Sequence, residues 1–178
     1  TTPSEIVMNP TDCSPKLFVH LKRDLSVLHY VNAGANEYYA PIFGEFDEDH
    51  IAAVISYETG SCAFELNQST ITPILLQDGN THQIKNAYGH YYFEFTSNAR
   101  KNTGIKVEGE GHYIFKVSND ESGTSFVEES KFSSMLIPNL DIVNGNKHYM
   151  IFEAFSDQKF SITILFHSHD AHLLYKDR

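Results

Sequence analysis

The sequence contains no tryptophan, only two cysteines and few basic residues. Its 13 lysine and arginine residues face 23 acidic residues, which gives a formal net charge of −10. The basic residues form no cluster of the kind that binds a phosphate backbone or an anionic lipid surface, so we expect no nucleic-acid partner. No apolar run approaches the length that crosses a bilayer, since the longest, around residues 160–166, is interrupted by Ser161 and Thr163. We therefore expect no transmembrane segment.

Short catalytic motifs are also missing from the sequence. It has no Gly-x-Ser-x-Gly elbow, no phosphate-binding loop and no dinucleotide fingerprint. No segment sustains the i, i+3, i+4, i+7 spacing of an amphipathic helix. These absences favour a protein that is not an enzyme, built without long helices.

The dominant pattern is alternation with a period of two, which is typical of half-buried strands. Alternating sets of apolar residues are Tyr91, Phe93 and Phe95; Phe160, Ile162, Ile164 and Phe166; Tyr113, Phe115 and Val117; and Ile51, Ala53, Ile55 and Tyr57. Turn residues separate these runs at short intervals, as in Asp78-Gly79-Asn80 and Asn144-Gly145-Asn146. About nine or ten such strands predict an all-β protein, an antiparallel β-sandwich of jelly-roll or CUB-like type. We predict a single domain over residues 1–178.

One alternative division of the chain comes from an internal echo. An aromatic strand, a polar turn and a β-branched strand occur at residues 93–107 and again at residues 149–166. The echo leaves open two small modules, divided near residue 111.

The two cysteines and one sequon point to an oxidising compartment. Cys13 and Cys62 are the only two cysteines and are far apart, and Asn67-Gln68-Ser69 is an N-glycosylation sequon, whereas Pro10 excludes Asn9. We expect a Cys13–Cys62 disulfide, a glycan on Asn67 and an extracellular or surface-exposed location. The alternative is a pair of free thiols in a cytosolic protein.

The stretch YYFEFTSNARKNTGIKV at residues 91–107 resembles the closing hairpin of CUB and CUB-like domains. That hairpin has an apolar strand, a polar loop, and a glycine with a hydrophobic residue opening the last strand. The segment from Phe155 to Ile162 resembles it a second time. The resemblance implies an extracellular β-sandwich used for binding.

Three histidines near the C-terminus, His167, His169 and His172, are metal-ligand candidates. His167 and His169 share one face of a continuing strand, roughly 7 Å apart, whereas His172 has the opposite parity. A cupin-like metal-dependent enzyme would use such a pair. The alternative is that the pair faces solvent, with His172 packed or beyond a turn.

The loop containing Glu45, Asp47 and Asp49 offers the carboxylate oxygens that Ca²⁺ prefers. Its spacing does not match the twelve-residue calcium loop. A solvated acidic turn is the other interpretation.

Clustered tyrosines suit the recognition of a protein or a glycan, because a tyrosine combines contact area with a polar tip. Tyr38 and Tyr39, with Pro41 nearby, are expected at the surface, and Tyr92 on the outward face of its strand. The sequence therefore predicts a non-catalytic extracellular module that binds a protein or glycan partner, with self-association left open. A spike or attachment domain of a viral or surface assembly, and the cupin-like enzyme, are the alternatives.

Overall fold

The computed structural model describes residues 2–34, 36–44, 48–85, 89–96, 101–109, 111–118, 126–129, 134–137, 147–155 and 159–168. The described residues contain strands and no helix, and almost all strand pairs are antiparallel, so the predicted all-β antiparallel fold is confirmed. The jelly-roll topology and the CUB resemblance stay predictions. Within the described ranges no helix is long and apolar enough to cross a membrane.

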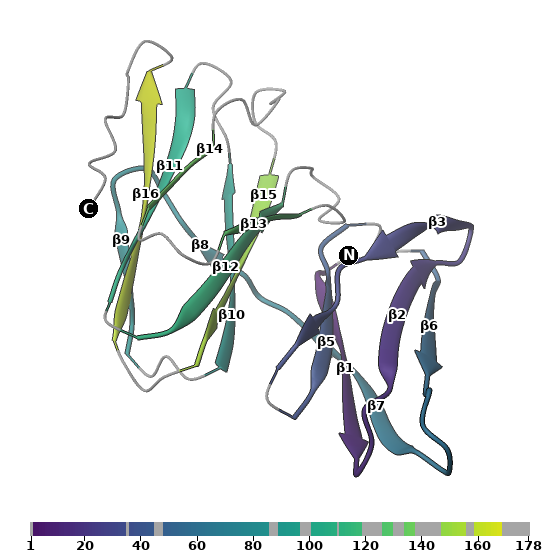
Figure 1. Ribbon diagram of the computed structural model, residues 1–178. Helices are drawn as coiled ribbons and strands as arrows, with labels where there is room; N and C mark the ends of the chain where they lie inside the picture. Colours follow the sequence, from purple (N-terminus) through teal and green to yellow (C-terminus); the bar gives the residue numbers. More distant parts are fainter. Residues whose placement is uncertain are drawn as a thin grey trace. The chain divides into compact units, whose positions relative to one another are not determined.

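The chain divides into two compact units (Figure 1). The first comprises residues 1–73 with 120–127, and the second comprises residues 74–119 with 128–178. This boundary does not coincide with the division that we considered near residue 111. The single domain stays a prediction.

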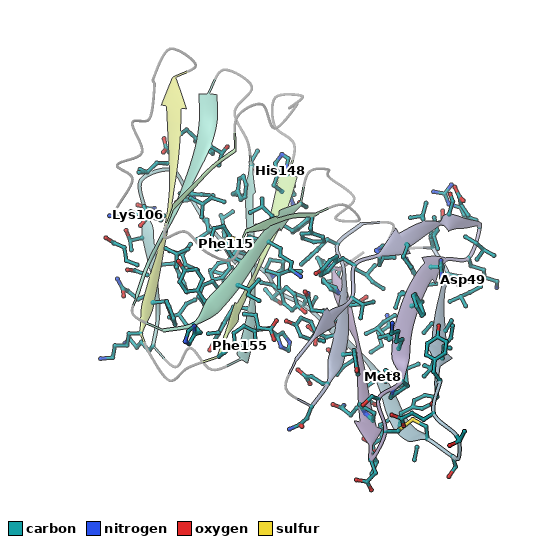
Figure 2. The ribbon with its side chains drawn as sticks, viewed as in Figure 1. Met8, Asp49, Lys106, Phe115, His148 and Phe155 are labelled. Carbon is teal, nitrogen blue, oxygen red and sulfur yellow. A yellow bond between two sulfur atoms is a disulfide. The ribbon has the colours of Figure 1, made fainter. Side chains whose placement is uncertain are left out.

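The first unit is built from two sheets. Its strands are β1 (Ser4–Thr11), β2 (Lys16–Leu21), β3 (Asp24–His29), β4 (Asn32–Ala33), β5 (Tyr38–Ile42), β6 (His50–Ile55) and β7 (Ala63–Thr70). One sheet has the order β4-β5-β1-β7 and the other the order β3-β2-β6. A shared core draws side chains from both sheets, namely Ile6, Met8, Leu17, Val19, Ala40 and Ile42. The first unit is therefore a small β-sandwich, with Met8 on its inner side (Figure 2).

The second unit also has two sheets. Its strands are β8 (Ile74–Leu75), β9 (Thr81–Ile84), β10 (Gly89–Thr96), β11 (Lys101–Glu108), β12 (Tyr113–Ser118), β14 (Ser134–Ile137), β15 (Lys147–Ala154) and β16 (Phe160–Ser168). Strand β13 (Phe126–Glu129) pairs in one of these sheets, although its first two residues are counted with the first unit. The sheet orders are β13-β12-β15-β10-β8 and β14-β11-β16-β9. Aromatic contacts join the two sheets. The ring centroid of Phe160 on β16 lies 5.3 Å from the ring centroids of Phe152 on β15 and Tyr113 on β12.

The internal echo has a structural counterpart in the second unit. β10 pairs with β15 and β11 pairs with β16, so the echoed strands lie side by side in each sheet. β10 and β11 belong to different sheets, and so do β15 and β16. The expected hairpins are therefore wrong. Each of these connections passes from one sheet to the other, which lets the apolar faces of both strands enter one core.

Gly109 lies where the backbone passes close to a core side chain. A Cβ atom at this position would overlap the Phe160 ring and lie 2.9 Å from the Lys159 carbonyl oxygen. Phe160 is 1 % exposed and has little room to yield. Gly109→Ala is therefore expected to lower the free energy of unfolding by about 1–3 kcal/mol, as measured by urea denaturation.

Gly34→Ala is the matched control for this prediction. A Cβ atom there would meet the flexible Glu37 side chain at 3.2 Å, which can move aside. Wild-type stability in the Gly109→Ala protein would contradict the close approach to Phe160.

Candidate functional site

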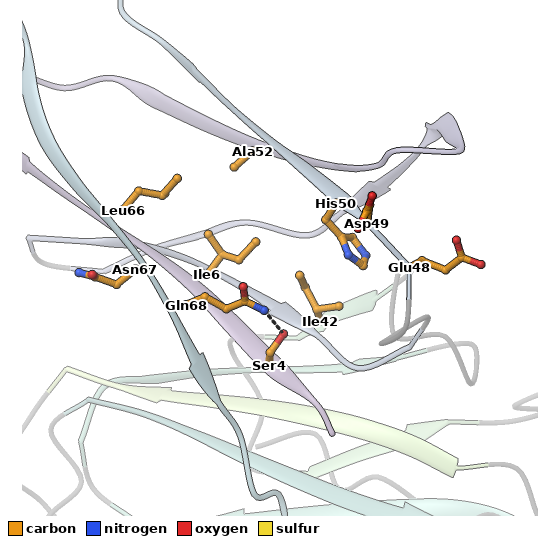
Figure 3. Close-up of a pocket in the computed structure, with 10 residues that line it drawn as sticks. All are labelled: Ser4, Ile6, Ile42, Glu48, Asp49, His50, Ala52, Leu66, Asn67 and Gln68. Atoms are coloured by element: carbon orange, nitrogen blue, oxygen red, sulfur yellow. Dashed lines mark hydrogen bonds between the residues drawn. The ribbon is translucent and has the colours of Figure 1, made fainter. Parts of the chain in front are cut away.

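A pocket in the described part of the first unit opens between the edges of β6 and β7 (Figure 3). Its volume is about 540 Å³. We call it the β6–β7 slot, and its lining residues are Ser4, Ile6, Ile42, Glu48, Asp49, His50, Ala52, Leu66, Asn67 and Gln68. All ten residues belong to the first unit.

The slot exists because the inner faces of two edge strands are incompletely covered. Register pairs Leu66 on β7 with the fully buried Met8 on β1, so Leu66 has the parity of the core-facing residues. Leu66 nevertheless remains 43 % exposed. Ala52 on β6 pairs with the buried Val19 and is only half-buried. The sandwich core is thus open to solvent along this side.

Polar groups flank the apolar floor of the slot. Gln68 Nε2 donates to Ser4 Oγ at 3.4 Å (Figure 3). The Nε2 atoms of His50 and the buried His29 lie 3.1 Å apart, so one ring donates its N–H and the other accepts. Six of the ten lining residues are polar or charged and four are apolar, so the slot is a mixed groove in which a small apolar floor is bordered by polar groups.

The acidic groups at the mouth of the slot have basic neighbours. Lys22 Nζ lies 3.1 Å from Asp49 Oδ2, and Arg23 Nε lies 3.3 Å from Glu48 Oε1. On the adjoining hairpin, the Ser26 hydroxyl and backbone N–H both donate to Asp24 Oδ1 and lower the pKa of that carboxyl. The mouth of the slot and the β2–β3 hairpin therefore carry charged side chains of both signs.

Charge is distributed unevenly along the chain. Residues 1–73 contain ten acidic and three basic residues, a net charge of −7. Residues 74–178 contain thirteen acidic and ten basic residues, a net charge of −3. Residues 1–73, which form the slot, therefore carry most of the net negative charge of the chain, although they make up less than half of its length.

Exposed apolar residues also lie on the outer face of the three-stranded sheet. Ile51 and Ile55 on β6 are each 41 % exposed, and Leu28 on β3 is 45 % exposed. The alternating set of Ile51, Ala53, Ile55 and Tyr57 thus includes three exposed residues, since Tyr57 is 75 % exposed. The opposite set, His50, Ala52 and Val54, faces the core, because it pairs with the buried Leu21, Val19 and Leu17.

The expected tyrosine surface is largely absent from the described residues. Tyr39 is fully buried and Pro41 is buried, so their predicted role as surface contacts is wrong. Tyr39 pairs with Asn32 on one side and Val7 on the other, so it lies on the sheet face opposite to Met8 and Ala40 and is buried on that face. Tyr38 is half-buried and packs against the core, and Tyr92 on β10 is also half-buried.

The structure leaves the metal predictions open. Strand β16 continues through His167, which pairs with Asn102, but the His167 side chain, His169 and His172 lie outside the described residues. Glu45 and Asp47 also lie outside them, and the third calcium candidate, Asp49, pairs with Lys22. Within the described ranges, no three His, Cys, Asp or Glu side chains come together as a metal site.

The predicted disulfide is present and adjoins the strands of the slot. Cys13 and Cys62 are bonded, with their Cα atoms 5.6 Å apart. Cys13 follows β1 and Cys62 precedes β7, so the bond closes the end of the β1–β7 ladder beside the pair Thr11–Ala63. The sequon residue Asn67 lies on β7 and is exposed.

Sequence reasoning missed the slot itself, including His50, Ala52, Leu66 and Gln68. The alternation of Phe64, Leu66 and Gln68 indicates a strand face, but an edge position depends on sheet order. Comparison with protein-family models gives no match for this chain, and comparison with curated proteins gives none either.

Proposed function

We propose that the chain is a non-catalytic extracellular binding module that holds a segment of a partner protein in the β6–β7 slot. The observation that carries the proposal is the open side of the first sandwich. There, core-facing residues such as Leu66 and Ala52 are left accessible beside two strand edges. Covering exposed inner-face residues of this kind with another apolar side chain lowers the free energy, because apolar surface is removed from water.

Polar groups at the slot can supply specificity to binding. His50 is bonded to His29, Asp49 pairs with Lys22, and Glu48 pairs with Arg23. The two ion pairs are exposed, so their charges remain accessible to a partner.

The extracellular location is part of the same proposal. It is supported by the Cys13–Cys62 disulfide, since such bonds persist in oxidising compartments. It is also supported by the exposure of the sequon residue Asn67. By register Asn67 has the parity of Val7, opposite to Leu66, and it also borders the slot.

A peptide-display experiment tests this function. Full-length protein with its disulfide formed is used to select from a random peptide library, and we expect enriched sequences that bind it. Leu66→Arg is expected to weaken the binding of these peptides at least about tenfold, because it places a charge on the apolar floor. Leu66 is 43 % exposed, so this variant can keep its fold.

Leu75→Arg is the matched control, since Leu75 is also an exposed strand leucine, at 55 %, and belongs to the second unit. Circular dichroism of both variants checks that they fold. Selection without enrichment, or peptides that bind the Leu66→Arg protein as tightly as the wild type, would contradict the proposed function.

A further inference from the structure

We propose that the occupant of the β6–β7 slot is an extended basic segment of another protein, which adds to β7 as a further strand. This inference rests on the proposed function and specifies the chemistry of its partner. Three features of the first unit carry it: the free edge of β7, the position of its inward-facing side chains, and the charge of residues 1–73.

β7 offers a long, regular edge for pairing. It spans eight residues, and its register with β1 runs without a bulge from Thr70 to Ala63. Among the strands that the structure describes, β7 pairs only with β1, so its other edge presents N–H and C=O groups. Edges are commonly protected by charged residues, proline, bulges or short length. β7 contains no lysine, proline or bulge, and Glu65 is its single charged residue. Such an edge is a template for strand addition.

The side chains of β7 show where a guest strand would gain apolar contacts. Phe64 and Leu66 face the same side as the buried Met8, yet each is 43 % exposed. A strand beside β7 would continue the first sheet and place every second side chain over the slot, toward the half-buried Ala52 on β6. The partner should therefore carry apolar residues at alternate positions.

Charge selects a basic partner over a second copy of this chain. Residues 1–73 have a net charge of −7, and the exposed Glu65 lies in the middle of β7. Pairing β7 with β7 of another copy would bring two such acidic segments together, which electrostatic repulsion opposes. Lysine or arginine at the remaining alternate positions would instead be attracted, and this attraction should weaken with salt.

The test uses fluorescein-labelled ten-residue peptides in which valine alternates with lysine, titrated with the full-length protein and followed by anisotropy. A charge-reversed peptide carries glutamate in place of lysine. We expect the lysine peptide to bind at least about tenfold more tightly than the glutamate peptide. Glu65→Lys should weaken the lysine peptide several-fold, as about one lost charge pair predicts, whereas Glu58→Lys, at an exposed residue outside β7, should change it little.

Backbone methylation separates strand addition from simple insertion. Methylating the valine amides and methylating the lysine amides block opposite edges of the peptide. Strand addition predicts that only one of these peptides loses at least about tenfold in affinity, because a single edge faces β7. Equal effects of the two methylations, equal binding of the two charge variants, or a β7-paired dimer in light scattering would overturn the inference.

The two proposals can fail separately. Library-selected peptides that depend on Leu66 but show no preference for basic sequences would leave the proposed function standing and remove this inference. Failure of both the selected and the designed peptides to bind would remove both.

Discussion

Replacing Cys13 and Cys62 together by serine is expected to lower the free energy of unfolding by about 4 kcal/mol. The disulfide joins residues 49 positions apart, so it restricts a long loop in the unfolded chain. It also fixes the end of the β1–β7 ladder, where Cys62 adjoins the exposed strand β7. Urea denaturation followed by circular dichroism measures the change, and reduction of the wild type should produce a similar loss.

Ser61→Ala is the control for the double replacement, because Ser61 is exposed and adjoins Cys62. It should change stability by no more than about 0.5 kcal/mol. If the double variant loses less than about 1 kcal/mol, the loop constraint contributes far less than its length predicts.

Phe152→Ala is expected to cost about 4 kcal/mol, because it leaves a cavity in the aromatic core of the second unit. Phe152 is fully buried on β15, and its ring centroid lies 5.3 Å from Phe160 and 5.5 Å from Tyr113. The cavity would lie where these rings join the two sheets, so neighbouring side chains can fill it only in part. Thermal and urea unfolding of the variant measure the loss.

Phe155→Ala is the matched control for this core substitution. Phe155 follows the same strand directly but is 44 % exposed, and its truncation should cost about 1 kcal/mol or less. Equal losses for the two phenylalanines would contradict the placement of Phe152 at the centre of the core.

The strands with strict alternation were predictable from sequence, including their buried faces. Phe93 and Phe95 on β10, and Ile162 and Ile164 on β16, are buried as their spacing predicts. Large apolar residues alternate with more polar ones in these strands, so a single face can enter a core. The disulfide was predictable because Cys13 has one conceivable partner in the chain.

Predictions failed where the answer depends on non-local pairing. Both faces of β6 are apolar, so alternation along the sequence could not show whether Ile51 or Ala52 faces the core. The register with β2 shows that it is Ala52, which pairs with the buried Val19. Tyr39 is buried although its pairing with Val7 places it on the face of β5 opposite to the sandwich core, and local spacing could not predict cover on that face. The slot results from the sheet order, which leaves β7 beside β1 alone among the described strands, and spacing along the chain carries no record of that order.

Amide hydrogen exchange along β7, measured by NMR with and without the valine–lysine peptide, shows whether a guest strand pairs with the free edge of β7. In the free protein, every second amide of Ala63–Thr70 should bond to β1 and exchange slowly, while the alternate amides exchange fast. Saturation with the peptide should slow the fast set, because those amides would then bond to the guest strand. Uniformly slow exchange in the free protein, or a fast set of amides that the bound peptide leaves unchanged, would contradict strand addition at β7.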